Sequence, residues 1–128
     1  MNDNEITING EEWIKKSSLP PSSEKNAVNT EGLPYVICRG YYCGVHAGFL
    51  KWHDGNHVRL VNSRRMWAWK AQQGITLSAV AKYGITKDTD LPNVLDEIWL
   101  GDVWEIIPCT ETAAKSIQEA ADYEQRTY

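Results

Sequence analysis

Tyr35-Val-Ile-Cys-Arg39 opens the stretch that decides the fold, which continues through Val45-His-Ala-Gly-Phe-Leu-Lys-Trp52 to His57-Val-Arg-Leu-Val61. These segments are rich in β-branched and aromatic residues, and Val58 and Leu60 alternate with polar neighbours on one face of the last of them. A glycine-flanked turn at Gly40–Gly44 and a tight Asp-Gly turn after Trp52 separate them. The pattern predicts an antiparallel β-meander.

Downstream of the meander the periodicity changes. Thr76 as N-cap, an apolar stripe through Val80 and Gly84 as C-cap predict one short helix. Leu95–Leu100 and Val103–Ile107 predict a second hairpin, joined near Gly101 and ended by Pro108. A C-terminal helix, expected to be loosely held, follows from Thr110.

Upstream, Glu5–Ile14 alternates around Asn9-Gly10, which favours a type I′ turn and a small β-hairpin. Pro and Ser then make residues 17–34 a predicted linker. The expected organisation is an N-terminal hairpin arm (1–16), this linker, a β-rich core domain (35–109) and a C-terminal helix and tail (110–128). The predicted fold class is α+β. A tethered arm of this kind predicts a homo-oligomer.

Composition limits the classes of protein. The 128 residues suffice for one core and include six Trp and six Tyr but a single Phe, so most rings carry a polar group for a partner. The acidic start does not resemble a signal peptide, and no apolar run approaches transmembrane length. Three cysteines without a secretion signal disfavour a disulfide framework and indicate a reducing cytoplasm.

The net charge of −4 hides an asymmetry. Residues 36–87 carry eight basic side chains against Asp54 alone, a net charge of +7. The rest of the chain carries five basic residues against sixteen acidic ones. We call residues 36–87 the basic island. It predicts either an anionic ligand or pairing with the acidic flanks.

Several motifs together resemble an uncharacterised family of small proteins from tailed bacteriophages and prophages. They are Tyr35-Val-Ile-Cys-Arg39, Gly44-Val-His-Ala-Gly48, Asn62-Ser-Arg-Arg-Met-Trp-Ala-Trp-Lys70, Leu77-Ser-Ala-Val-Ala81 and Glu105-Ile-Ile-Pro-Cys-Thr-Glu111. The resemblance implies a phage origin and expression in the cytoplasm of a bacterial host. It implies no activity.

The segment Asn62–Lys70 is the strongest candidate for a binding site. Guanidinium groups bind phosphates through paired hydrogen bonds, and indole rings stack on bases. The Gly40–Gly44 loop would add one wall of a nucleotide pocket. In the alternative, the arginines line a solvated face or pair with acidic residues of the second hairpin, namely Asp96, Glu97 or Glu105. The predicted ligand-binding residues are Arg64, Arg65, Trp67, Trp69, Lys70, Arg39, Tyr41, Tyr42 and Asn62.

Motifs for catalysis and for cofactors are missing from the sequence. No Cys or His pair has the setting of a zinc knuckle, and no nucleophile elbow, phosphate loop or dinucleotide fingerprint occurs. We therefore expect a non-enzymatic phage accessory protein without a cofactor or metal, which binds a nucleotide or other phosphorylated ligand or antagonises a host defence protein. The alternatives are a structural or assembly protein that uses its aromatics for protein contacts, and a nucleic-acid-binding protein.

Overall fold

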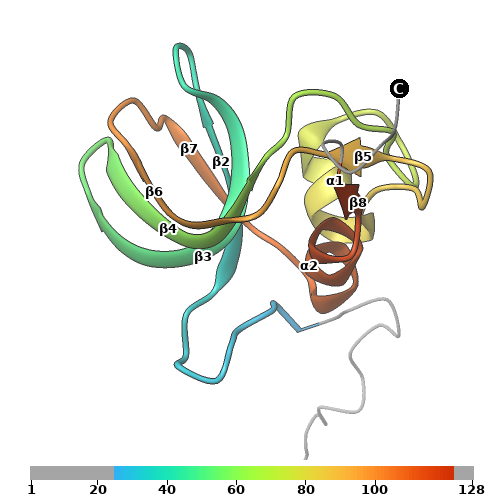
Figure 1. The fold of residues 1–128 in the computed structure, drawn as a ribbon, viewed down its shortest axis with the longest axis horizontal. Helices are drawn as coiled ribbons and strands as arrows, with labels where there is room; N and C mark the ends of the chain where they lie inside the picture. Colours follow the sequence, from blue (N-terminus) through green and yellow to red (C-terminus); the bar gives the residue numbers. More distant parts are fainter. Residues whose placement is uncertain (1–24, 123–128) are drawn as a thin grey trace, which may run out of the picture.

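The computed structural model describes residues 25–122. Two helices and seven named strands follow one another along this part of the chain (Figure 1). In chain order they are β2 (Tyr35–Gly40), β3 (Gly44–Asp54), β4 (His57–Arg65), α1 (Leu77–Tyr83), β5 (Asp90–Leu91), β6 (Leu95–Leu100), β7 (Glu105–Pro108), α2 (Glu111–Gln118) and β8 (Ala121–Asp122). The predicted α+β class and the meander β2–β3–β4 are confirmed.

The main sheet has five strands in the order β6-β4-β3-β2-β7, and all pairs are antiparallel. The predicted second hairpin is wrong, because β6 pairs with β4 while β7 pairs with β2 at the opposite edge. Only residues 101–104 join these two edge strands. The sheet therefore curls on itself into an incomplete barrel, with α1 and α2 to one side (Figure 1).

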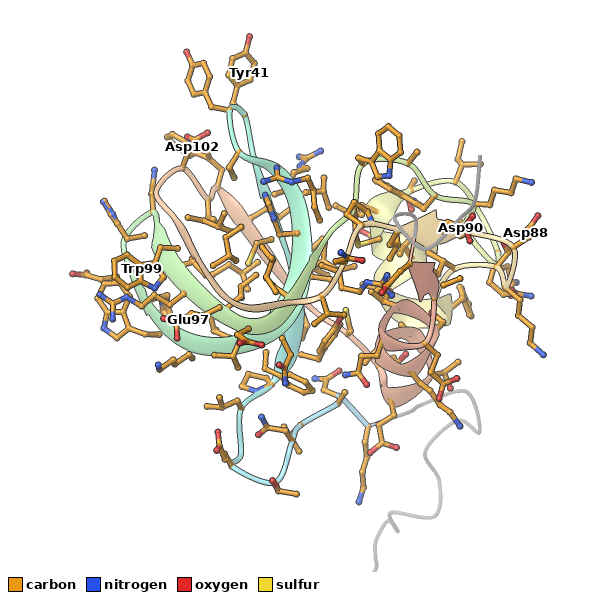
Figure 2. All side chains as sticks on the ribbon, viewed as in Figure 1. Tyr41, Asp88, Asp90, Glu97, Trp99 and Asp102 are labelled. Atoms are coloured by element: carbon orange, nitrogen blue, oxygen red, sulfur yellow. The ribbon has the colours of Figure 1, made fainter. Side chains whose placement is uncertain are left out.

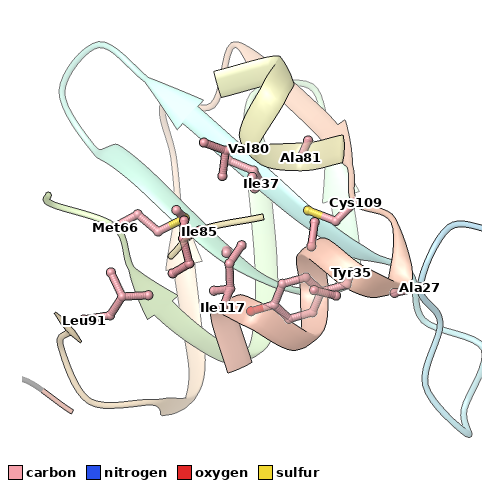
Figure 3. Close-up of a cluster of buried hydrophobic side chains, with 13 residues drawn as sticks. Ala27, Tyr35, Ile37, Met66, Val80, Ala81, Ile85, Leu91, Cys109 and Ile117 are labelled. Atoms are coloured by element: carbon pink, nitrogen blue, oxygen red, sulfur yellow. The ribbon is translucent and has the colours of Figure 1, made fainter. Parts of the chain in front are cut away.

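Each face of the curled sheet has its own core. Val36, Cys38 and Leu60 belong to a cluster inside the barrel. Tyr35 and Ile37, the alternate residues of β2, face the other way and pack with α1, α2 and the chain around Met66. In Figure 2 the labelled Tyr41 and Trp99 lie on the barrel side, whereas Asp88 and Asp90 lie on the helical side. Figure 3 shows the core beneath the helices.

Capping residues mark the ends of the helices. The side chain of Thr76 accepts a hydrogen bond from the Ala79 N–H, and α1 ends at Gly84, as predicted. Thr110 caps α2 in the same way. The expectation that the C-terminal helix is loosely held is wrong. Three of its residues, Ala113, Ala114 and Ile117, are buried, so the core continues beyond the boundary expected after Cys109.

Part of the expected linker also belongs to the packed unit. Ala27 is buried, its N–H donates to the Cys109 carbonyl, and its own carbonyl accepts from the Tyr35 N–H. Asn26 forms a bridge with Thr110. The segment from Lys25 to Pro34 therefore lies against the domain, while the predicted hairpin arm lies outside the described residues.

Two shifts of register in the β3–β4 pairing decide on which face of the sheet Arg64 and Trp52 lie. Between the pairs Phe49–Val61 and Ala47–Arg64, β4 has one extra residue, and Asn62 there has a φ of 49°. Between the pairs Leu50–Leu60 and Trp52–Arg59, β3 has one extra residue, Lys51. Because side chains alternate along a strand, each bulge moves the following side chains to the opposite face.

Candidate functional site

Arg64, the centre of the predicted anion site, is buried in the domain with 1% of its side chain exposed. The bulge at Asn62 puts it beside Ala47 on the face that the helices cover. Its guanidinium donates to the Asp122 carboxylate at 2.7 Å and to carbonyl oxygens, which belong to Leu91, Pro92, Ile117, Ala120 and Ala121. All of its donors are used inside the protein. The prediction that Arg64 binds a ligand is therefore wrong.

The other residues of the predicted segment are dispersed. Arg65 is exposed on the opposite face, with Nη1 3.5 Å from Nε2 of His46. Trp69 packs against the core, whereas Trp67 is 57% exposed. Lys70 pairs with Asp88 at 3.0 Å, and Asn62 is exposed in its left-handed conformation. The structure therefore does not bring the Asn62–Lys70 side chains together as one site.

The acidic flanks neutralise much of the basic island. Each of the four ion pairs found among residues 25–122 joins a base of the island to an acid outside it. These pairs are Arg39–Glu105, Lys51–Glu97, Arg64–Asp122 and Lys70–Asp88. Glu97 and Glu105 pair with Lys51 and Arg39, whereas Arg64 pairs with Asp122, so the acidic partners predicted for the arginines of the Asn62–Lys70 segment are not the ones that Arg64 uses.

Exposed aromatic rings gather instead at one end of the barrel. Tyr41 and Tyr42, at the β2–β3 turn, are 84% and 85% exposed, and their rings meet edge to face at 4.8 Å. Trp104, from the β6–β7 connection, is 73% exposed. A pocket of about 490 Å³ is lined by Arg39, Gly40, Tyr41 and Trp104. We call these residues together with Tyr42 the aromatic tip.

Asp102 holds the two loops of the aromatic tip together. Its carboxylate accepts hydrogen bonds from the Tyr42 backbone N–H and from Nε1 of Trp104. Both bonds lower the pKa of the Asp102 carboxyl, and the bond from the Tyr42 N–H has the larger effect. A side chain at Gly40 would collide with the Asp102 carbonyl, so only glycine permits this approach. The two loops of the aromatic tip are therefore held in place without a ligand.

A second aromatic group crosses three strands. Trp52 lies opposite Arg59, and Arg59 lies opposite Trp99, in the register of β3, β4 and β6. The guanidinium carbon of Arg59 is 5.2 Å from the Trp52 ring centre and 4.4 Å from that of Trp99. Trp99 is 69% exposed and donates to Glu97. We call this group the Trp–Arg–Trp row.

Four residues of these surfaces escaped the sequence prediction: Trp52, Arg59, Trp99 and Trp104. Trp52 lies two residues before the Asp54-Gly55 turn, and Trp99 and Trp104 lie on either side of Gly101-Asp102. A position close to a turn is the signal that could have pointed to these three residues. Arg39, Tyr41 and Tyr42 were predicted, and the structure brings them beside Trp104.

The buried thiols and imidazole do not form a nucleophile with a base. Burial raises the pKa of both Cys38 and Cys109 to about 12, which keeps these thiols protonated. Nε2 of His46 lies 2.7 Å from the Cys43 carbonyl oxygen and donates to it, and burial lowers the pKa of the His46 imidazole. Within residues 25–122, no group of three or more Cys, His, Asp or Glu side chains could hold a metal ion. No helix of this part is long and apolar enough to span a membrane.

Residues 33–117, which include the aromatic tip, the Trp–Arg–Trp row and Arg64, match the model of a domain of unknown function, DUF6948. The chain belongs to this family. No curated protein and no solved structure matches the chain. Membership in this family therefore assigns no activity to the chain.

Replacing Arg64 tests its structural role. We expect Arg64→Ala to lower the free energy of unfolding by about 3–5 kcal/mol, because the buried carbonyl groups of Leu91 and Ile117 and the partly exposed Asp122 carboxylate lose their donor. Arg65→Ala, a matched change at the exposed neighbour, should cost under about 1 kcal/mol. Urea unfolding of both variants measures the difference, and equal losses would contradict the assignment.

His46 predicts a dependence of stability on pH. Burial lowers its pKa, and nearby Arg65 lowers it further, against the opposing effect of the Cys43 bond. As the pH falls, the unfolded chain therefore takes up a proton at His46 more readily than the folded chain does. The free energy of unfolding keeps its full value above about pH 6.5 and declines below that pH, by at most about 1.4 kcal/mol per pH unit.

Urea unfolding at several values between pH 5 and pH 7.5 measures this decline. His46→Gln should flatten the curve in that range. The exposed His57→Gln is the control and should keep the decline of the unchanged protein. An unchanged curve for His46→Gln would show that another group causes the decline.

Proposed function

We propose that this protein is a non-enzymatic binding protein that takes a nucleotide at the aromatic tip. The observation that carries the proposal is the pocket of about 490 Å³ between Tyr41 and Trp104, with Arg39 at its side. Binding pockets commonly combine a mostly apolar lining with a few placed polar groups. The tip has both.

The chemistry of a nucleotide fits these side chains. Every base has a π-face that stacks on exposed Tyr or Trp rings. Arg39 contacts Glu105 through its Nε at 3.1 Å, and 60% of its side chain is exposed. Glu105 thus orients the guanidinium, and the Nη groups can meet a phosphate. The raised pKa of the buried Cys38 and Cys109 thiols supports binding without catalysis.

A titration with mono-, di- and cyclic nucleotides tests the proposal on the full chain. We expect a nucleotide to raise the melting temperature, and Tyr41→Ala and Trp104→Ala each to weaken its binding roughly 5- to 100-fold, the size of one lost base–ring stack. Calorimetry measures the affinities.

The control is Trp67→Ala, an exposed indole of the basic segment away from the tip pocket. It should leave nucleotide affinity unchanged. An equal loss of nucleotide affinity in Trp67→Ala would indicate that the nucleotide binds at the Asn62–Lys70 segment instead. Absence of any shift at millimolar nucleotide would reject a nucleotide as the ligand.

The Trp–Arg–Trp row supports a second function, contact with another protein. Trp and Arg dominate the energetically important residues of protein interfaces, and here they form an exposed stack across three strands. Lys51 and Glu97 form an ion pair beside it at 3.1 Å. The same surface would serve the homo-oligomer predicted from the N-terminal arm, and an assembly role in general.

Sedimentation velocity separates the two functions. If the row mediates self-association, Trp99→Ala should convert the oligomer to a smaller species at micromolar concentration, because a central interface Trp typically contributes about 2 kcal/mol or more. Trp104→Ala, the same change at the tip, should leave the oligomer intact. A monomer in the unchanged protein would remove self-association as the role of the row.

The resemblance to small phage proteins gives the setting that we propose, the cytoplasm of an infected bacterium. There a nucleotide-binding protein would sequester a signalling nucleotide of the host defence, or block a defence protein directly. Binding to nucleic acid is the alternative, and strongly salt-dependent retention of DNA or RNA would favour it. Deleting the gene from the phage genome and scoring growth on a defended host tests the setting.

A further inference from the structure

A third hollow lies on the helical side of the sheet, apart from both aromatic surfaces. It has a volume of about 230 Å³ and is lined by Tyr35, Phe49, Asn62, Arg64, Val94 and Gln118. Its residues therefore come from β2, β3, β4, the segment before β6, and α2. None of them belongs to the aromatic tip or to the Trp–Arg–Trp row.

Tyr35, one of the residues that line this cavity, carries an unpartnered polar group. Tyr35 is fully buried in the core shown in Figure 3, with its ring edge to face against Phe49 at 4.9 Å. Its hydroxyl is buried and makes no hydrogen bond to the described residues. A buried hydroxyl without a partner is costly, so it is a group that a ligand would satisfy.

Arg64 does not fill this role, although it lines the same cavity. Its guanidinium faces the carbonyl groups and Asp122, and those acceptors use its donors. The Arg64–Asp122 pair also leaves no unbalanced charge for an ionic ligand. The lining residues therefore include a phenol whose buried hydroxyl has no partner, together with the apolar side chains of Phe49 and Val94.

The rim is polar and includes the residue at the bulge of β4. Asn62 and Gln118 are both exposed and carry amide side chains. Asn62 holds a φ of 49° at the bulge, in the left-handed region that Asn adopts more readily than most other non-glycine residues. The bulge that buries Arg64 thus also places an amide at the opening of the cavity.

We propose that this cavity binds a small, neutral, planar molecule with a hydrogen-bond acceptor at one end. The ring lies against Phe49 and Val94, the acceptor receives the Tyr35 hydroxyl, and the amides of Asn62 and Gln118 contact the outer end. The volume suits a single-ring compound, well below the size of a whole nucleotide. This site is independent of the proposed function of the aromatic tip.

Benzamide is the probe, because it joins a ring to a carbonyl acceptor, and toluene is the matched probe without the acceptor. We expect benzamide to shift the side-chain amide NMR signals of Asn62 and Gln118 and to leave that of Asn56, at the β3–β4 turn, unchanged. Tyr35→Phe should weaken benzamide binding roughly 2- to 12-fold, the effect of one hydrogen bond, and leave toluene binding unchanged. Trp104→Ala should not affect either probe.

The melting temperature of the ligand-free variants gives a second readout. Tyr35→Phe should match or exceed the unchanged protein, because it removes a buried hydroxyl that has no partner. Tyr83→Phe is the control at a half-buried phenol of α1. A Tyr35→Phe protein that melts several degrees lower than Tyr83→Phe, or benzamide binding that ignores the Tyr35 change or disappears in Trp104→Ala, would overturn the proposal.

Discussion

The buried guanidinium of Arg64 is the interaction on which the rest of the domain depends. Transfer of a charge from water to the interior is costly unless it is paired and all its hydrogen bonds are made. Arg64 meets both conditions with the Asp122 carboxylate and carbonyl oxygens from the end of α2 and the chain around β5. One side chain thereby fastens β4 to the C-terminal elements. These elements are too short to hold their position alone, since β5 and β8 each have two residues.

Two single-residue bulges decide which side chains the sheet buries and which it displays. Without the extra residue at Asn62, strict alternation from Val61 would place Arg65 on the helix-covered face and Arg64 inside the barrel. Without the extra residue Lys51, Trp52 would turn away from Arg59. The same distortion of β4 that completes the core also shapes the cavity above Tyr35. Stability and candidate binding sites therefore share one cause.

The helical layer covers only part of the barrel, and the uncovered part carries the aromatic surfaces. The aromatic tip is held by Asp102, whereas the Trp–Arg–Trp row is held by the strand register. Rings fixed in this way lose little entropy on binding, which favours recognition by rigid surfaces. Pairing of the basic island with the acidic flanks leaves few concentrated charges, so shape and stacking carry more of the proposed binding than net charge does.

The sequence by itself determined the local structure and the composition of the surfaces. The meander through His57–Val61, the helix between Thr76 and Gly84, and the contrast of basic island and acidic flanks all follow from short-range patterns. Only the tertiary structure decided that β6 and β7 lie on opposite edges, that Arg64 rather than Arg65 is buried, and that Trp104 meets Tyr41. The reason is physical. Caps, turns and alternation act within a few residues, whereas strand partners and bulges are selected by the packing of segments far apart in the chain.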